Sequence, residues 1–451
     1  MTRRWQTVRV TPPLTVLFMP ESAYGPTNQC IGLGKVLLDR GHTVVFAAER
    51  SWEGKLAPFG FVEDLVDLAP PATGVDGAEP EAAGQYWIDF VRQTAPEFRK
   101  ATIEQLATVV EPTYRALVDG AKYCEPQLRD IIARHRPGVI VEDNVVSFPT
   151  IMATRAPWVR IVSCNPAEVK DPLIAPFSSG YPAADQREWP AFLDEVRRTH
   201  GDMWADFDAF CRDNGAGGLP WGSNGPDFMH ESPYLNLYSY PREADYERAV
   251  PLAPTWHQLD STVRAAEATW ALPESLAGRP GALVYLSLGS LGSADVGLMQ
   301  RLVDLLGRTE HRVIVSKGPL ADRIRLHDNM TGDGFLPQPA ILPQVDLVIT
   351  HGGNNTVVEC FHHGKPMVVL PLFWDQVDNA QRVDETGFGR RLATYDFRDE
   401  ELAGAIDALL ADKALRSRMA TIATRMQSTA GTVRAADLIE RLALTGQPVT
   451  R

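Results

Sequence analysis

Residue types suited to binding an anion are concentrated between positions 335 and 381. An apolar run typical of a buried strand, Val345–Thr350, leads into His351-Gly-Gly-Asn-Asn-Thr356, where a helix is expected to begin. Glycines after a strand allow a ligand close to the backbone, and the unpaired amides of a helix start carry about +0.5 of dipole charge. We therefore predict an anion site at this turn, with further hydrogen-bond donors from His351, Asn355 and Thr356.

Acidic and amide side chains extend this site toward a hydroxyl-rich ligand. Glu359 lies one helical turn beyond Thr356, where its carboxylate could accept hydrogen bonds from ribose hydroxyls. The next apolar strand ends at Pro371-Leu-Phe-Trp-Asp375-Gln376, which offers a carboxylate and an amide together. An ordinary glycine-rich turn would explain the glycine pair alone. It does not explain the spacing of all these side chains across two successive strand ends, which indicates one shared ligand.

Strand and helix patterns alternate twice along the chain, and this predicts the scaffold of the site. The first half has strands at Leu14–Met19, Thr43–Ala48, Gly138–Val141 and Trp158–Val162, and helices at about 28–40, 85–135 and 190–212. The second half has strands at Leu283–Ser287, Arg312–Val315, Leu347–Thr350 and Met367–Leu370, and helices at about 295–307 and 354–363. Strand–helix–strand units imply parallel sheets. We predict an α/β protein with two Rossmann-like, doubly wound domains, residues 1–255 and 256–451, facing a cleft.

The composition excludes several classes of protein. The 451 residues are 44% hydrophobic and 22% charged, which is typical of a folded chain and not of a disordered or fibrous one. A net charge of −13 argues against non-specific binding to nucleic acid or anionic membranes. No run of about 18 apolar residues occurs, so we expect neither signal peptide nor membrane span, and a cytoplasmic location. The five scattered cysteines are predicted to be reduced, and Asp206-Phe-Asp208 is interpreted as a solvated helix face, so no metal site is expected.

The stretch from Phe335 onward closely resembles the donor-binding box of family 1 glycosyltransferases, the UDP-glycosyltransferases of the GT-B fold. Phe335-Leu-Pro-Gln338 is similar to the opening of that box, His351–Glu359 to its phosphate and ribose segment, and Asp375-Gln376 with Asn379-Ala380 to its end. Ser287-Leu-Gly-Ser290 resembles the family's Ser-Leu-Gly-Ser/Thr loop. The two-domain pattern extends the resemblance over essentially the whole chain, with bacterial natural-product glycosyltransferases as the nearest type.

The resemblance implies a role for each matching residue. His351 would contact the diphosphate, supported by Asn355 and Thr356, and Ser290 would lie near the β-phosphate. Phe335 would stack on the base, Gln338 would lie beside it, and Glu359 would bind the ribose. Asp375 and Gln376 would hold sugar hydroxyls, and Gly353 and Trp374 complete the predicted donor set. A fixed histidine with helix amides can stabilise the charge of a leaving diphosphate, so His351 is also predicted to be catalytic.

The first half departs from the family at the position of the general base. Relatives carry Gly-His-x-Asn-Pro after the first strand, whereas this chain has Gly25-Pro26-Thr27-Asn28-Gln29, and Pro26 cannot accept a proton. The family's second dyad member, an acid at the end of a later strand, matches Asp143, which we predict to be the catalytic base. Other candidates are Glu21, Glu142 and the histidines His230 and His257, or the acceptor needs little base assistance. His42, in Arg40-Gly-His42, is interpreted as structural.

These features together predict a metal-independent, inverting glycosyltransferase that moves a hexose from a nucleotide sugar to a small, partly apolar natural-product acceptor. A UDP-sugar is favoured as donor and a dTDP-sugar is possible, with no other cofactor and no nucleic-acid partner. Two alternatives remain: a catalytically impaired nucleotide-sugar-binding or partner protein, suggested by Pro26, and a sugar-nucleotide epimerase. Aromatic residues of the first half are candidates for the acceptor pocket, although the ordinary core is their simpler interpretation: Trp87, Phe90, Phe148, Phe177, Tyr181, Trp189, Trp204 and Trp221.

Overall fold

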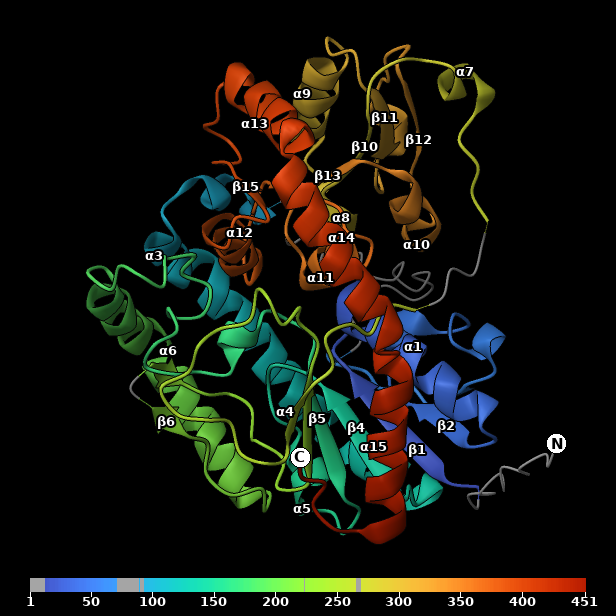
Figure 1. Cartoon of the computed structure of the whole chain (residues 1–451). Helices are drawn as coiled ribbons and strands as arrows, with labels where there is room; N and C mark the ends of the chain where they lie inside the picture. The colour runs from blue at the N-terminus through green and yellow to red at the C-terminus, as the bar shows by residue number, and fades with distance from the viewer. Residues whose placement is uncertain (1–12, 71–88, 90–92, 223, 265–268) are drawn as a thin grey trace, which may run out of the picture.

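Two parallel β-sheets form the centres of the two halves of the molecule (Figure 1). The computed structural model describes residues 13–70, 89, 93–222, 224–264 and 269–451. The first sheet runs in the order β3 (Val62–Glu63), β2 (Thr43–Phe46), β1 (Thr15–Pro20), β4 (Val139–Asp143), β5 (Trp158–Val162), β8 (Leu235–Tyr238) and β9 (Trp256–Gln258). The second runs β12 (Met330–Asp333), β11 (Arg312–Ser316), β10 (Leu283–Ser287), β13 (Leu347–Thr350), β14 (Met367–Val369) and β15 (Gly389–Arg391). The predicted α/β fold class is confirmed.

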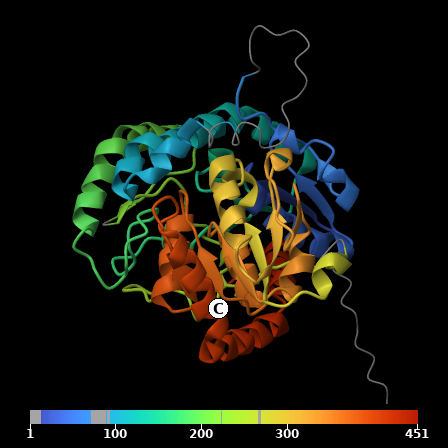
Figure 2. The ribbon, with the colours of Figure 1, turned by 90° about the horizontal axis from the view of Figure 1, so that it is seen from above.

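Helices connect the parallel strands and cover the sheets (Figure 2). In the first half they are α1 (Tyr24–Asp39), α3 (Thr102–Gln105), α4 (Glu111–His135), α5 (Pro149–Ala153) and α6 (Trp189–Asp213), and a short strand pair, β6 (Trp221–Gly222) and β7 (Gly225–Pro226), follows α6. In the second half they are α7 (Glu274–Ala277), α8 (Gly289–Gly292), α9 (Val296–Leu306), α10 (Gln338–Ile341), α11 (Asn354–His362), α12 (Gln376–Glu385), α13 (Asp399–Ala411), α14 (Lys413–Ser428) and α15 (Gly431–Thr445). Among the described residues, none of these helices combines the length and apolar character needed to cross a membrane.

The strand order places one switch point in each sheet, and both switch points face the same space. In the first sheet β1 lies between β2 and β4, and in the second β10 lies between β11 and β13. In such sheets ligands bind outside the carboxyl ends of the strands where the order reverses. The register brings Pro20 opposite Asp143 and Ser287 opposite Thr350. The residues that follow, Glu21 in one half and His351 in the other, are therefore held at the two switch points.

The sequence predicted the long buried strands well and missed shorter ones. Buried on both faces, β1, β4, β10 and β13 read as continuous apolar runs, as strands of parallel sheets do. β8 was missed because its four residues lie in a segment rich in proline and aromatic residues, and β9 was missed because it has only three residues and lies close to Pro251 and Pro254. β9 pairs with β8 in the first sheet. The division into domains 1–255 and 256–451 stays a prediction.

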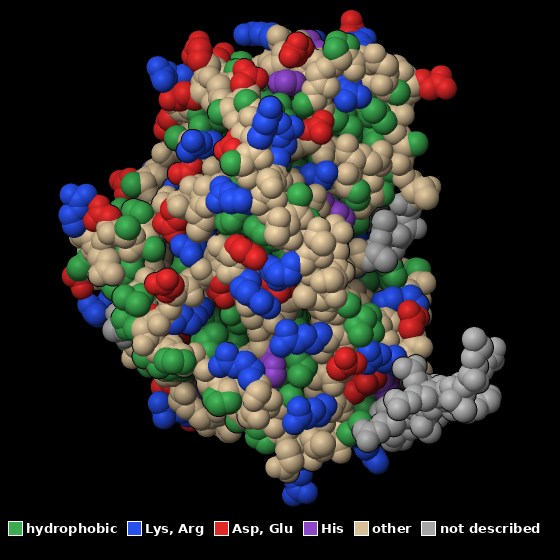
Figure 3. Space-filling view, in the orientation of Figure 1, with side chains coloured by type: hydrophobic (Ala, Val, Ile, Leu, Met, Phe, Trp, Pro, Cys, Tyr) green, Lys and Arg blue, Asp and Glu red, His purple; other side chains and the backbone are tan. Residues whose placement is uncertain are grey.

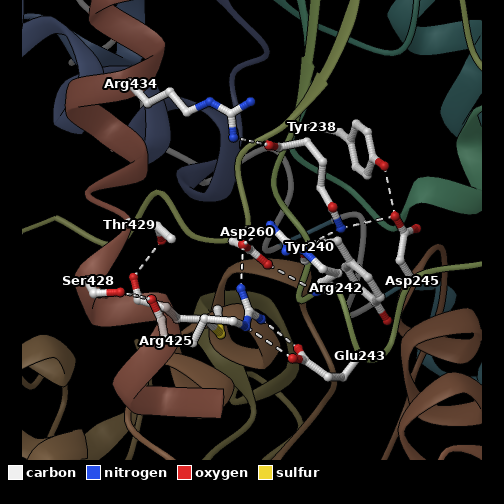
Figure 4. Close-up of polar contacts among 12 residues, drawn as sticks. Tyr238, Tyr240, Arg242, Glu243, Asp245, Asp260, Arg425, Ser428, Thr429 and Arg434 are labelled. Carbon is white, nitrogen blue, oxygen red and sulfur yellow. Dashed lines mark hydrogen bonds and ion pairs between the residues drawn. The ribbon is translucent and has the colours of Figure 1, made fainter. Parts of the chain in front are cut away.

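The chain crosses between the halves after β9 and again between α14 and α15. Gly431 shows how closely the crossings pack, because a Cβ atom there would lie 1.8 Å from the carbonyl oxygen of Ser261. An ion-pair cluster ties them together: Arg425 contacts Glu243 at 2.6 Å and Asp260 at 2.5 Å (Figure 4). The carboxylate of Asp260 is buried, so breaking its ion pair is costly, whereas Glu243 is exposed and its pair with Arg425 contributes little. The crossings therefore form a fixed connection between the two halves.

The last helix returns to the first half and packs on α1, as Figure 1 shows. Arg40 pairs with Asp437 and Glu440 of α15, and His42 Nε2 lies 2.8 Å from Glu440 Oε1. His42 Nδ1 also accepts the backbone N–H of Leu14 at 3.2 Å. The structural interpretation of His42 is confirmed. On the face of the molecule seen in Figure 3, acidic and basic side chains are interspersed.

Candidate functional site

A cavity of about 580 Å³ lies between the carboxyl ends of the two sheets. Residues of both halves line this cavity. All the predicted donor residues are among them: Ser290, Phe335, Gln338, His351, Gly353, Asn355, Thr356, Glu359, Trp374, Asp375 and Gln376. From the first half it is lined by Glu21, Pro26 and Asp143, among others. The volume falls in the range typical of ligand sites. The fold thus gathers residues that are more than 300 positions apart around one space.

His351 is held rigidly at the end of β13. A Cβ atom on Gly289 or on Gly353 would come within 2.7 Å of the imidazole ring, so only glycine fits on either side of it. The backbone of Ser287 forms a hydrogen bond with the ring, and burial lowers the pKa of His351 to about 4. The imidazole is therefore neutral at neutral pH. An anion in the cavity would raise this pKa, because a nearby negative charge favours the imidazolium.

The start of α11 contacts the first half directly. Asn355 Nδ2 donates to the carbonyl oxygen of Gly25 at 2.9 Å, and Asn354 Nδ2 donates to the carbonyl oxygens of Ser163 at 3.0 Å and Ser239 at 3.2 Å. These contacts were not predicted, because sequence spacing does not show which loops of the two halves meet. The helix start that follows His351 is consequently fixed relative to the loop that carries Pro26.

A second group of side chains lies at the far end of the cavity. Gln338 Nε2 donates to Glu359 Oε2 and, at 3.2 Å, to Thr356 Oγ1. Burial raises the pKa of Glu359 to about 7, and the hydrogen bond from Gln338 opposes that shift. Phe335 is 65% exposed and lines the same cavity. The arrangement suits a planar nucleobase with a hydroxyl-bearing sugar ring attached to it.

The third group surrounds Asp375 at the start of α12. Asp375 Oδ2 accepts hydrogen bonds from the backbone N–H of Asn165 at 2.9 Å and from Asn379 Nδ2 at 3.3 Å. Gln376 Oε1 accepts the backbone N–H of Leu372 at 3.1 Å. Trp374 has a positive φ of 59° and packs against Tyr114 at 4.9 Å between ring centroids. A carboxylate and an amide are thus presented on a rigid turn.

Two acids of the first half meet at the ends of β1 and β4. The backbone N–H of Glu21 donates to the carbonyl oxygen of Asp143 at 2.8 Å, and Cys30 Sγ lies 3.9 Å from Asp143 Oδ2. The pKa of each carboxyl is raised to about 7, mainly by burial, and the charge of Glu21 contributes to the rise for Asp143. Each of the two carboxyls is therefore partly ionised near neutral pH and available as a base.

The other base candidates lie away from the cavity. Glu142 precedes Asp143 on β4 and points to the opposite face of the sheet, where it accepts the backbone N–H of Phe148 at 3.3 Å. His230 Nδ1 lies 2.8 Å from Ser147 Oγ, and His257 Nε2 lies 3.0 Å from the carbonyl oxygen of Val449. None of the three lines the cavity. Their placement removes them as candidates for a base.

The aromatic residues singled out in the first half belong mainly to its core. Phe148, Phe177, Tyr181, Trp189, Trp204 and Trp221 do not line the cavity, and Trp87 and Phe90 lie outside the described residues. The largely apolar side chains that do line the cavity include Tyr24, Leu117, Val145, Phe373 and Trp374. Leu117 lies on α4, which no motif marked. The simpler interpretation therefore holds for the described members other than Trp221, which is half-buried and packs against Trp204.

Comparison with known proteins adds an independent line of evidence. The family model described as "UDP-glucoronosyl and UDP-glucosyl transferase" matches residues 277–426, which include all the predicted donor residues. An oleandomycin glycosyltransferase of Streptomyces antibioticus is 27% identical over 95% of this chain and 91% of that protein. The crystal structure of the glycotransferase of kitacinnamycin superposes with a TM-score of 0.68 at 22% identity, over 95% of this chain and 99% of that one. The glycosyltransferase VinC in complex with dTDP superposes with a TM-score of 0.61 at 17% identity, over 95% and 100%.

Proposed function

From the premise that this chain is a glycosyltransferase with the GT-B fold, similar to the UDP-glycosyltransferases of family 1, we propose the reaction that it catalyses. It transfers a hexose from a nucleoside diphosphate sugar to a small, partly apolar natural-product acceptor, with inversion and without a metal ion. The main observation that supports the proposal is that His351, from the second half, and Asp143, from the first half, line the same cavity. A leaving-group site and a base on opposite walls are what an in-line displacement requires.

In the proposed mechanism Asp143 removes the proton from the acceptor hydroxyl as its oxygen attacks the anomeric carbon. The bond from that carbon to the diphosphate oxygen breaks with its electron pair, and the nucleoside diphosphate leaves from the opposite face of the sugar. His351 and the amides at the start of α11 stabilise the growing negative charge on the diphosphate. Because there is a single displacement, the configuration at the anomeric carbon inverts.

The donor is proposed to be a UDP-sugar, with a dTDP-sugar as the second candidate. Glu359 is a ribose-binding carboxylate in this proposal, and a UDP ribose offers one more hydroxyl than that of dTDP. The dTDP complex of the structurally similar VinC supports testing both nucleotides. Asp375 and Gln376 are proposed to bind hydroxyls at C3 and C4 of the hexose. The apolar residues on α1, α4 and the loop after β4 are proposed to receive the acceptor.

The decisive experiment is mass spectrometry of the products from a screen of UDP- and dTDP-sugars against an acceptor panel. We expect an acceptor heavier by one hexose residue, together with free nucleoside diphosphate. A changed sugar nucleotide with no transfer would indicate the epimerase alternative. Nucleotide-sugar binding without transfer or hydrolysis across the panel would indicate the catalytically impaired alternative that Pro26 suggests.

Removing divalent metal should leave the activity unchanged. The proposed leaving-group stabilisation comes from His351 and helix amides, which are fixed in the fold and need no cation. Turnover measured in excess chelator is therefore expected to match turnover with Mg²⁺ within about twofold, a change of less than about 0.5 kcal/mol in the barrier. A loss that Mg²⁺ restores would contradict the metal-independent mechanism.

The pH dependence of kcat/KM should report the Glu21–Asp143 pair. Burial raises the pKa of each carboxyl to about 7, so each is protonated below neutral pH and ionised above it. Since the base must be ionised, kcat/KM is expected to rise with pH and level off above about 7.5, with roughly a tenfold loss per unit below the apparent pKa. The rising limb should disappear in Asp143→Asn. A flat profile from pH 5 to 8 in the unmodified enzyme would contradict a carboxylate base.

A further inference from the structure

We propose that Asn165, in the first half, is a positioning residue for the donor sugar bound in the second half. The inference rests on the proposed function, in which Asp375 holds sugar hydroxyls. Asn165 follows β5 and is fully buried, and neither it nor Asn379 lines the cavity. Any effect of Asn165 on the donor must therefore pass through the residues that it contacts.

A chain of hydrogen bonds runs from the first half to Asp375. The backbone N–H of Ala167 donates to Asn165 Oδ1 at 2.8 Å, and Asn165 Nδ2 donates to Asn379 Oδ1 at 2.8 Å. Asn379 Nδ2 then donates to the carbonyl oxygen of Gly352 at 2.9 Å and to Asp375 Oδ2 at 3.3 Å. Each step joins buried groups, so each bond is protected from competition by water.

This order of donors and acceptors fixes the rotation of both amides. An asparagine side chain has one accepting and one donating end, and a half-turn exchanges them. Ala167 fixes the accepting end of Asn165, and the donating end of Asn165 then fixes the accepting end of Asn379. The donating end of Asn379 is consequently held toward Asp375 and Gly352. Asn165 thus determines that Asp375 receives a hydrogen bond from Asn379, although Asn165 itself does not line the cavity.

The consequence for the donor site is a fixed carboxylate. With the N–H of Asn165 and Nδ2 of Asn379 both bound to Oδ2, the plane of the Asp375 carboxylate is set, and so is the direction of its other oxygen. The same amide holds Gly352, which precedes the helix start beside His351. The sugar and diphosphate parts of the site are thereby placed relative to each other by a residue of the acceptor half. The sugar site is complete only when the two halves are in contact.

The closing experiment exchanges the donating end of Asn165 for an accepting one. In Asn165→Asp, the new carboxylate attracts the donating end of Asn379, which then turns away from Asp375. Asn165→Ala only removes the constraint. We expect kcat/KM for the nucleotide sugar to fall roughly 10-fold in the alanine variant and roughly 100-fold in the aspartate variant, the range for a buried group left unpaired. The measured affinity for UDP or dTDP alone, by calorimetry, should stay within about twofold because the nucleotide does not reach Asp375.

Asn236→Asp is the matched control. Asn236 is equally buried in the first half, and within the described part of the chain its side chain forms hydrogen bonds with Ser232 and Thr255. The Asn236→Asp variant is expected to have a lower melting temperature but an unchanged ratio of kcat/KM for UDP-glucose to kcat/KM for UDP-galactose. Asn165→Asp should bring that ratio closer to one. Equal losses in nucleotide affinity and kcat/KM, or no loss in either, would overturn the positioning role and leave the proposed function intact. If the unmodified protein binds no UDP, dTDP or their sugars, the proposed function itself fails.

Discussion

Replacing Asp143 by asparagine should reduce turnover at least about 100-fold, the typical cost of losing a general base. The side chain is nearly isosteric, but an amide cannot accept the proton of the acceptor hydroxyl. Asp143 belongs to the first half and has no contact with the nucleotide site in the proposed geometry. The affinity for UDP or dTDP is therefore expected to change little. Single-turnover kinetics with saturating donor, together with calorimetry of nucleotide binding, measures the two quantities separately.

Variants of two neighbouring acids, Glu142 and Glu21, test whether the loss of turnover is specific to Asp143. Glu142→Gln is the matched control, because Glu142 is the adjacent buried carboxyl on β4 but points away from the cavity. Burial raises its pKa well above the usual range, so the neutral glutamine replaces a protonated acid and should leave turnover unchanged. Glu21→Gln tests the other buried acid that lines the cavity from the first half. If Asp143→Asn retains near-normal turnover while Glu21→Gln loses it, Glu21 is the base.

The second large effect is expected from His351→Ala. Loss of a fixed group that stabilises developing negative charge typically costs about 10²–10³ in kcat. The ring is packed between Gly289 and Gly353, so its removal leaves a void between two residues that have no side chain. We expect a loss of kcat with donors of every leaving nucleotide, and a smaller effect on the affinity for the unreacted nucleotide sugar, because the charge grows only as the bond breaks.

His230→Ala provides the control for this substitution. It removes another partly buried imidazole, one that contacts Ser147 outside the cavity. Its turnover should equal that of the unmodified enzyme, and circular dichroism should show both variants folded. An unaffected rate in His351→Ala would refute the leaving-group role. A rate loss matched by His230→Ala would show that the effect is structural.

The sequence was sufficient to predict the two-sheet scaffold and the residues of the donor site. β5, β10 and β13 have the predicted bounds, because strands covered on both faces are continuous apolar runs. The donor residues from Phe335 to Gln376 all line one cavity, because they follow the ends of neighbouring parallel strands, which meet at one edge of a sheet. Both inferences depend on patterns within a short stretch of chain.

The sequence could not distinguish Glu142 from Asp143 as a cavity-lining acid, and the tertiary structure did. Glu142 and Asp143 are adjacent, and only the orientation of β4 in its sheet decides that Asp143 faces the cavity and Glu142 the opposite side. Pairing of Asn165 with Asn379 and of Asn355 with Gly25 joins segments more than 200 positions apart. Such contacts leave no local pattern, because they depend on how two separately wound sheets are set face to face.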